Sequence, residues 1–145
     1  RIRELPASFF DHVSITRLEL WDNRLRELPA ELSKLVNLTD LNLQTNRLTG
    51  PLADVFGNLT NLTKLGLHVN GITELPESLC QLVNLKELNL TWNMLKVLPE
   101  NFGNIVNLKI LNLDRNQLLY LPASFTKLVN LEVRSFVYPY LSNNI

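Results

Sequence analysis

The chain has 145 residues, of which 46% are hydrophobic and 19% charged, so it can bury a core and is not disordered by composition. Its 14 Lys and Arg residues balance 14 Asp and Glu residues, which excludes a global electrostatic attraction to nucleic acid or to an anionic membrane. A single cysteine excludes disulfides within the chain, and no apolar run approaches the roughly 18 residues of a membrane span. This composition argues against most classes of enzyme.

A repeat of 23 or 24 residues runs along the chain. Asparagines recur at intervals of 23, 24, 23 and 23 residues, and two rows of leucines keep the same step. The asparagines are Asn23, Asn46, Asn70, Asn93 and Asn116, and the leucines are Leu18, Leu41, Leu65, Leu88 and Leu111 in one row and Leu20, Leu43, Leu67, Leu90 and Leu113 in the other. One such unit cannot cover its own apolar face, so the period predicts a solenoid in which neighbouring units bury each other.

We interpret residues 1–145 as a single domain of stacked units. The five full units are 15–37, 38–61, 62–84, 85–107 and 108–130. Residues 1–14 are the second half of a unit, and residues 131–145 are a degenerate last unit or cap. Beginning and ending within a unit is also typical of a fragment of a longer protein.

Each full unit is expected to start with a short strand and to continue into a turn. In the first unit, Leu18 and Leu20 alternate with outward residues, so the period of two places both leucines in the core. The asparagine ends the strand, and its amide can bond backbone groups of the neighbouring turn. A proline then starts a turn or a short 3₁₀ helix on the outer side, at Pro29, Pro76, Pro99 and Pro122.

The pattern L-x-x-L-x-L-x-x-N-x-L-x-x-L-P, which Leu85 to Pro99 follow, resembles the leucine-rich repeat superfamily in its 23-residue form. It is most similar to repeats of intracellular scaffolds of the Scribble and Ras-suppressor kind, and of related bacterial and plant proteins. The resemblance spans residues 15–130. It implies an α/β fold, a right-handed leucine-rich-repeat solenoid with a concave parallel β-sheet and an outer arc of short helices, 3₁₀ turns and loops.

Three segments depart from this pattern. The second unit has one extra residue near Gly50, which we expect to be absorbed as an insertion on the outer arc. In the N-terminal half unit, His12 takes the position of a core leucine and is interpreted as a cap residue. In the last unit, Arg134 replaces the strand leucine and Pro139 replaces the asparagine. We expect this strand to slip in register, with 133–140 covering the last core layer; the alternative is that it docks onto something outside the chain.

The sequence offers little for catalysis. No phosphate-binding glycine loop, paired metal ligands or nucleophile motif occurs, so no catalytic residue, metal or cofactor is predicted. Cys80 is interpreted as a passive, partly buried thiol. Asn-x-Thr sequons occur at Asn37, Asn58, Asn61 and Asn89. We interpret them as chance combinations of a threonine with an asparagine that the repeat itself needs, because asparagine also precedes the first leucine of each unit.

The outward residues of the strands should form the binding face. In strand order, one row reads Arg17, Asp40, Lys64, Glu87 and Ile110. Neighbouring strands lie about 4.8 Å apart, so the alternating charges of this row can pair with each other and keep the sheet soluble.

The two positions after each strand hold the candidate binding residues. They read Trp21-Asp22, Gln44-Thr45, His68-Val69, Thr91-Trp92 and Asp114-Arg115. The core does not need tryptophan here, and an exposed tryptophan is typical of interface anchors. We therefore predict that Trp92 and Trp21 anchor a partner, that Val69 adds an apolar contact, and that Arg115 and His68 select its orientation. The alternative is that each ring lies flat on its own sheet.

The sequence thus predicts a non-catalytic binding module or scaffold that recognises a protein or peptide with its concave face. The alternative is the recognition domain of a larger enzyme or receptor, such as a ligase-type effector, a kinase or an immune receptor, whose catalytic part lies outside this chain. No nucleic acid, membrane insertion or small-molecule substrate is expected. A cytoplasmic location is favoured because secreted members of the family usually carry cysteine-rich caps; an extracellular one stays open if such caps were removed.

Overall fold

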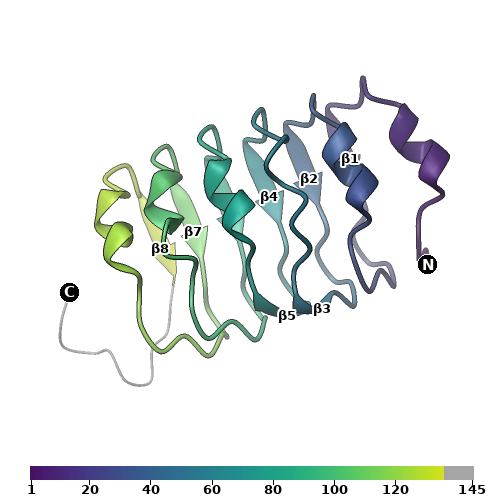
Figure 1. The fold of residues 1–145 in the computed structure, drawn as a ribbon. Helices are drawn as coiled ribbons and strands as arrows, with labels where there is room; N and C mark the ends of the chain where they lie inside the picture. Colours follow the sequence, from purple (N-terminus) through teal and green to yellow (C-terminus); the bar gives the residue numbers. More distant parts are fainter. Residues whose placement is uncertain (136–145) are drawn as a thin grey trace.

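The computed structural model describes residues 1–135, which form a right-handed solenoid (Figure 1). Six strands make one parallel sheet in the order β1-β2-β4-β6-β7-β8. They are β1 (Arg17–Glu19), β2 (Asp40–Asn42), β4 (Lys64–Gly66), β6 (Glu87–Asn89), β7 (Ile110–Asn112) and β8 (Val133–Ser135). Every strand pair among the described residues is parallel, as the repeat predicts.

The core is a set of leucine columns that run from unit to unit. Leu41 of β2 pairs with Leu18 of β1 on one side and with Leu65 of β4 on the other. All ten leucines that the period of two placed inside are at most 7% exposed, so the predicted register is confirmed. In β1, β2, β4, β6 and β7, one buried leucine lies between two residues that face outward.

The asparagines form the predicted ladder between units. The Nδ2 of Asn46 donates to the carbonyls of Leu20 and Leu43, at 2.9 and 3.0 Å, and its Oδ1 accepts from the N–H of Leu25 at 3.0 Å. Asn93 makes the same kinds of bond and is only 6% exposed. The buried amide thus supplies hydrogen bonds to backbone carbonyl and N–H groups of the turns, which an apolar side chain could not do.

Five short helices form the outer arc, on the side of the solenoid away from the main sheet (Figure 1). All described helices are 3₁₀ segments: η1 (Ala7–Asp11), η2 (Ala30–Lys34), η3 (Glu77–Gln81), η4 (Phe102–Asn104) and η5 (Ala123–Lys127). A proline directly precedes four of them, because its fixed φ starts the turn and its missing N–H costs nothing there.

The extra residue of the second unit creates a feature that the sequence analysis missed. Strand β3 (Thr49–Pro51) pairs with β5 (Gly71–Glu74) as a second parallel sheet, at the edge of the solenoid below the main sheet in Figure 1. Gly50 has a φ of +70°, and the pairing register shifts between Gly50 and Pro51. The insertion therefore centres on Gly50 as expected, but it is taken up within a strand and not by a bulge of the outer arc.

The two ends differ in how well the sequence predicted them. His12 caps the C-terminus of η1, as Leu35 caps η2, which confirms its position in the repeat, although its side chain is exposed. At the other end, β8 pairs with β7 so that Arg134 lies opposite Leu111. The predicted register slip is therefore wrong. The rest of the predicted cap, 136–140, lies outside the described residues.

Candidate binding surface

The concave face consists of the outward side chains of the main sheet, and its charges pair only partly as predicted. The Nζ of Lys64 on β4 lies 3.0 Å from Oε1 of Glu87 on β6, and this hydrogen bond and charge raise the pKa of Lys64. Arg17 pairs at 2.9 Å with Glu19 of its own strand, and not with Asp40 of the neighbouring strand. Near the middle of the sheet, the charges of the concave face thus neutralise each other.

A shallow groove of about 260 Å³ crosses this face. It runs from Arg17 on β1 to Asn112 on β7. Near its centre, Gly66 has no side chain, and a Cβ there would lie 3.1 Å from Oδ1 of Asn42. The missing side chain hollows the polar floor between β2 and β4, where a partner's backbone can approach closely.

The residues that directly precede the ladder asparagines form a second structural row, which we call the strand-end row. Its members are Asp22, Thr45, Val69, Trp92 and Arg115. All five have a φ between 52° and 58°, a left-handed conformation that non-glycine residues rarely adopt. Hydrogen bonds to the next unit hold the first four of them there; the N–H of Trp92, for example, donates to the carbonyl of Asp114 at 2.9 Å.

Three predicted site residues meet in this row. Trp92 is 56% exposed, and the guanidinium carbon of Arg115 lies 5.0 Å from the centre of its ring. Val69, which is 42% exposed, belongs to the same row one unit earlier. Val69, Trp92 and Arg115 therefore combine an apolar surface with a cationic rim, and the cation–π contact fixes one face of the indole.

The other two predicted site residues lie in the adjacent position of the repeat. Trp21 is 54% exposed, but it follows β1, three strands from β6 and so about 14 Å from Trp92 along the stack. His68 is partly buried, and desolvation lowers its pKa. Its Nδ1 is buried without a hydrogen-bond partner among the described residues. Burial therefore favours the neutral form of His68 over the charged form.

The described residues hold neither a cluster of metal ligands nor an activated thiol. No group of three His, Cys, Asp or Glu residues in the described part of the chain can hold a metal ion. Burial, with the nearby carboxylate of Glu77, raises the pKa of Cys80 to about 12, so the thiol is inert. No helix between residues 1 and 135 is long and apolar enough to cross a membrane.

A second asparagine ladder explains two of the sequons. The Nδ2 of Asn37 donates to the carbonyl of Val13 and that of Asn61 to the carbonyl of Val36, both at 2.9 Å. Asn84, Asn107 and Asn130 make equivalent bonds. The framework role predicted for these asparagines is confirmed.

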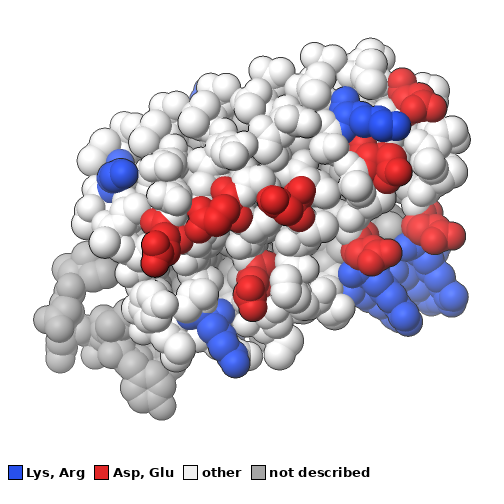
Figure 2. All heavy atoms as spheres, viewed as in Figure 1, with Lys and Arg blue, Asp and Glu red and all other residues white. Residues whose placement is uncertain are grey.

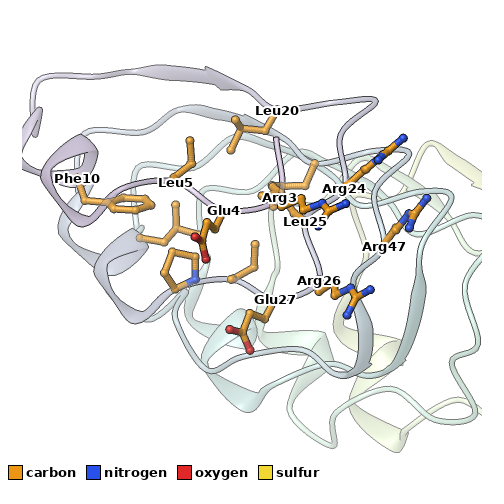
Figure 3. Close-up of a pocket in the computed structure, with 14 residues that line it drawn as sticks. Arg3, Glu4, Leu5, Phe10, Leu20, Arg24, Leu25, Arg26, Glu27 and Arg47 are labelled. Carbon is orange, nitrogen blue, oxygen red and sulfur yellow. The ribbon is translucent and has the colours of Figure 1, made fainter. Parts of the chain in front are cut away.

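A pocket that the sequence did not predict lies at the N-terminal end of the solenoid. Its volume is about 420 Å³, and Arg3, Arg24, Arg26 and Arg47 are among its lining residues (Figure 3). A signal was present in the sequence: Arg24 and Arg47 each follow a ladder asparagine, and Arg3 precedes Arg26 by one repeat.

Comparison with known proteins yields one family. Models described as leucine rich repeat match residues 13–72, 37–95 and 107–128. No curated protein sequence matches the chain significantly.

Several solved structures share the fold. A leucine-rich repeat protein of Leptospira interrogans is 30% identical with a TM-score of 0.85, over 96% of this chain and 37% of that one. The ectodomain of the plant membrane receptor kinase GASSHO1/SCHENGEN3 from Arabidopsis thaliana, in complex with CASPARIAN STRIP INTEGRITY FACTOR 2, is 29% identical with a TM-score of 0.84, over 92% of this chain and 17% of that one. An internalin of Listeria monocytogenes, 23% identical over 95% of this chain and 39% of that one with a TM-score of 0.80, is similar in fold alone. The chain thus spans less than half the length of each of these proteins.

Proposed function

Because the chain belongs to the leucine-rich repeat family, we propose that it is a non-catalytic module that binds a protein or peptide with its concave sheet and strand-end row. Leucine-rich repeats commonly mediate protein binding, and the similar plant ectodomain is in complex with CASPARIAN STRIP INTEGRITY FACTOR 2. The groove on the concave face is shallow and open along the sheet, which suits an extended chain or a loop.

The exposed indole of Trp92 is the observation that carries this proposal. More than half of this side chain faces solvent, although nothing in the leucine core requires an aromatic residue there. Arg115 on its face and Val69 in the same row give it the surroundings of an interface anchor. Trp21 lies about 14 Å further along the stack, a distance that an extended peptide spans in four or five residues.

A second candidate is that the chain is the recognition part of a larger receptor or enzyme. The similarity to a receptor-kinase ectodomain, of which the chain spans 17%, favours this alternative. The two candidates share the same binding surface and differ in what lies beyond residues 1 and 145. The open reading frame around this chain separates them.

A cytoplasmic location is part of the first candidate. The single cysteine supports it, since Cys80 is a buried free thiol. Asn58 provides a test, because it is an exposed sequon residue. Mass spectrometry of the protein from its native source should find Asn37, Asn58, Asn61 and Asn89 without glycans. A glycan on any of the four places the protein in the secretory pathway.

The binding surface can be tested with ligands selected from a displayed peptide library on the purified chain. For a selected ligand, Trp92→Ala and Trp21→Ala should each raise the Kd by about 30-fold, since truncating an anchor costs about 2 kcal/mol of binding. Tyr120→Ala is the matched control, because Tyr120 is also 56% exposed but lies outside the concave face and the strand-end row. Unfolding midpoints should stay the same in all three variants. Unchanged affinity in both tryptophan variants would move the site off this surface.

A further inference from the structure

The pocket at the N-terminal end is separate from the concave groove. It lies between the first residues of the chain and the turns that follow β1 and β2. Leu5, Phe10 and Leu25 are among the residues of its apolar part (Figure 3). Its volume of about 420 Å³ is within the usual range for a small ligand or a peptide side chain with its terminus.

Four arginines on the rim come from two rows of the repeat. Arg24 and Arg47 both stand directly after a ladder asparagine, and Arg3 and Arg26 stand two positions beyond that row. Hydrogen bonds between the turns fix the first pair: the N–H of Arg24 donates to the carbonyl of Ile2 at 2.8 Å, and that of Arg47 to the carbonyl of Leu25 at 2.9 Å. The stacking of units therefore places four arginines along one pocket, and Figure 3 shows Arg24, Arg26 and Arg47 on the same side of it.

These arginines have no ionic partner among the described residues. In contrast, Arg1 pairs with Asp22 at 3.0 Å and Arg17 pairs with Glu19 at 2.9 Å. Figure 2 shows Lys and Arg side chains gathered at the N-terminal end of the molecule, with acidic side chains directly above them.

The charges of the pocket do not balance. Glu4 and Glu27 also line it, so four guanidinium groups face two carboxylates. The Nε of Arg24 is buried and has no hydrogen-bond partner in the described part of the chain. A buried donor left without an acceptor is destabilising, and grouped cations repel each other. A bound anion corrects both defects.

We propose that this pocket binds an oxyanion carried on an apolar body, such as a carboxylate or phosphate monoester at the end of an alkyl chain. The planar forks of Arg24 and Arg47 suit two-point hydrogen bonds to such a head group. The leucine and phenylalanine side chains take up the attached apolar part. Two sources carry this chemistry, the C-terminal residue of a peptide that ends in an apolar side chain and a free small amphiphile.

Calorimetric titration of the complete chain tests the proposal with hexyl phosphate, inorganic phosphate and hexanol. Hexyl phosphate should bind at least about tenfold more tightly than either of the other two, because only it supplies both the anion and the apolar body. Comparable binding of all three, or no binding of hexyl phosphate at millimolar concentration, overturns the proposal.

Variants locate the binding. Arg24→Met and Arg47→Met should each weaken binding of hexyl phosphate about tenfold, as expected for the loss of a hydrogen bond to a charged group. Arg47 is exposed, so its variant remains informative if Arg24→Met fails to fold. Glu27→Gln should strengthen binding, because it removes a carboxylate from the pocket. Arg17→Met, which makes the same change of charge on the concave face, should have no effect, and an equal loss in this control shows non-specific attraction and overturns the site.

The source of the natural ligand follows from a second comparison. A short peptide that ends in Leu with a free carboxylate is titrated against its C-terminal amide. Tighter binding of the free acid than of hexyl phosphate indicates a peptide terminus, and the reverse indicates a small amphiphile. Equal binding of the acid and the amide contradicts recognition of the carboxylate. The concave groove and this pocket share no lining residue. A failure of the proposed binding at one of them therefore leaves the test of the other intact.

Discussion

Gly57 and Gly103 occupy the same position of a Phe-Gly-Asn sequence in the second and fourth units, but their surroundings differ. A Cβ added at Gly103 would lie 1.8 Å from the carbonyl oxygen of Ser124, a backbone atom of the adjacent η5. A Cβ at Gly57 would lie 2.8 Å from Oε1 of Gln81, the end of an exposed and flexible side chain. Gly103→Ala therefore forces two helices apart, whereas Gly57→Ala only displaces one side-chain terminus.

The cost can be worked out from these contacts. To reach normal van der Waals separation, η4 and η5 must move apart by about 1.5 Å, and overpacking of this kind costs about 1–3 kcal/mol. The movement also weakens the hydrogen bond from the N–H of Gly103 to Oγ of Ser124, now 3.0 Å, worth about 1 kcal/mol. Replacing glycine returns about 0.5–1 kcal/mol through the unfolded chain. The net expectation is a loss of about 2–3 kcal/mol for Gly103→Ala and a change within about 1 kcal/mol for Gly57→Ala.

Urea unfolding followed by circular dichroism measures both free energies. Hydrogen exchange should in addition show the loss of protection concentrated at η4 and η5, because units of a solenoid contact only their neighbours. A loss of unfolding free energy below 1 kcal/mol for Gly103→Ala, or equal losses for the two variants, would show that Gly103 does not pack tightly against the backbone of Ser124.

Three further predictions concern the core, the strand-end row and the thiol. Leu88→Ala should lower the free energy of unfolding by about 2–5 kcal/mol as a core cavity, while Glu87→Ala should change it by less than about 1 kcal/mol; a loss below 1 kcal/mol at Leu88 contradicts the register. Val69→Asn should raise the unfolding free energy by about 1 kcal/mol, because asparagine tolerates the left-handed backbone at φ 56°, whereas the same change at an exposed valine with ordinary backbone, Val83, should give no gain. Stability should fall as the pH rises above 9, since the thiol of Cys80 ionises near 9 in the unfolded chain but only near 12 in the folded one. The variant Cys80→Ala should lack this slope, and an identical pH profile would contradict a buried, protonated thiol.

The sequence predicted those parts of the fold that every unit repeats. In a stack of units, each strand leucine must be covered by the units before and after it. The period of two was therefore enough to predict which residues of each strand face the core. The asparagine ladder was predictable for the same reason, because a buried turn needs a side chain that both donates and accepts.

The features that the sequence did not reveal depend on the backbone. Nothing about Val69 or Trp92 signals a positive φ, since left-handed positions usually carry glycine or asparagine. Hydrogen bonds from the neighbouring unit impose that conformation on whichever residue stands there. Strand β8 was mispredicted for a related reason: the N–H of Glu132 donates to the carbonyl of Lys109 at 2.8 Å, so the sheet continues in register whatever side chain replaces the leucine.

The candidate sites follow from this separation between backbone and side chain. The five members of the strand-end row share one backbone conformation within 6° of φ, yet their side chains are Asp, Thr, Val, Trp and Arg. Because the framework makes the same demand at each position, it does not account for a tryptophan in the fourth unit. The row after the asparagines behaves likewise, with arginine in the first two units and Gly71, Met94 and Gln117 in the later ones. Stacking explains what recurs in a solenoid, so exposed residues that break the recurrence are the ones whose identity a ligand can select.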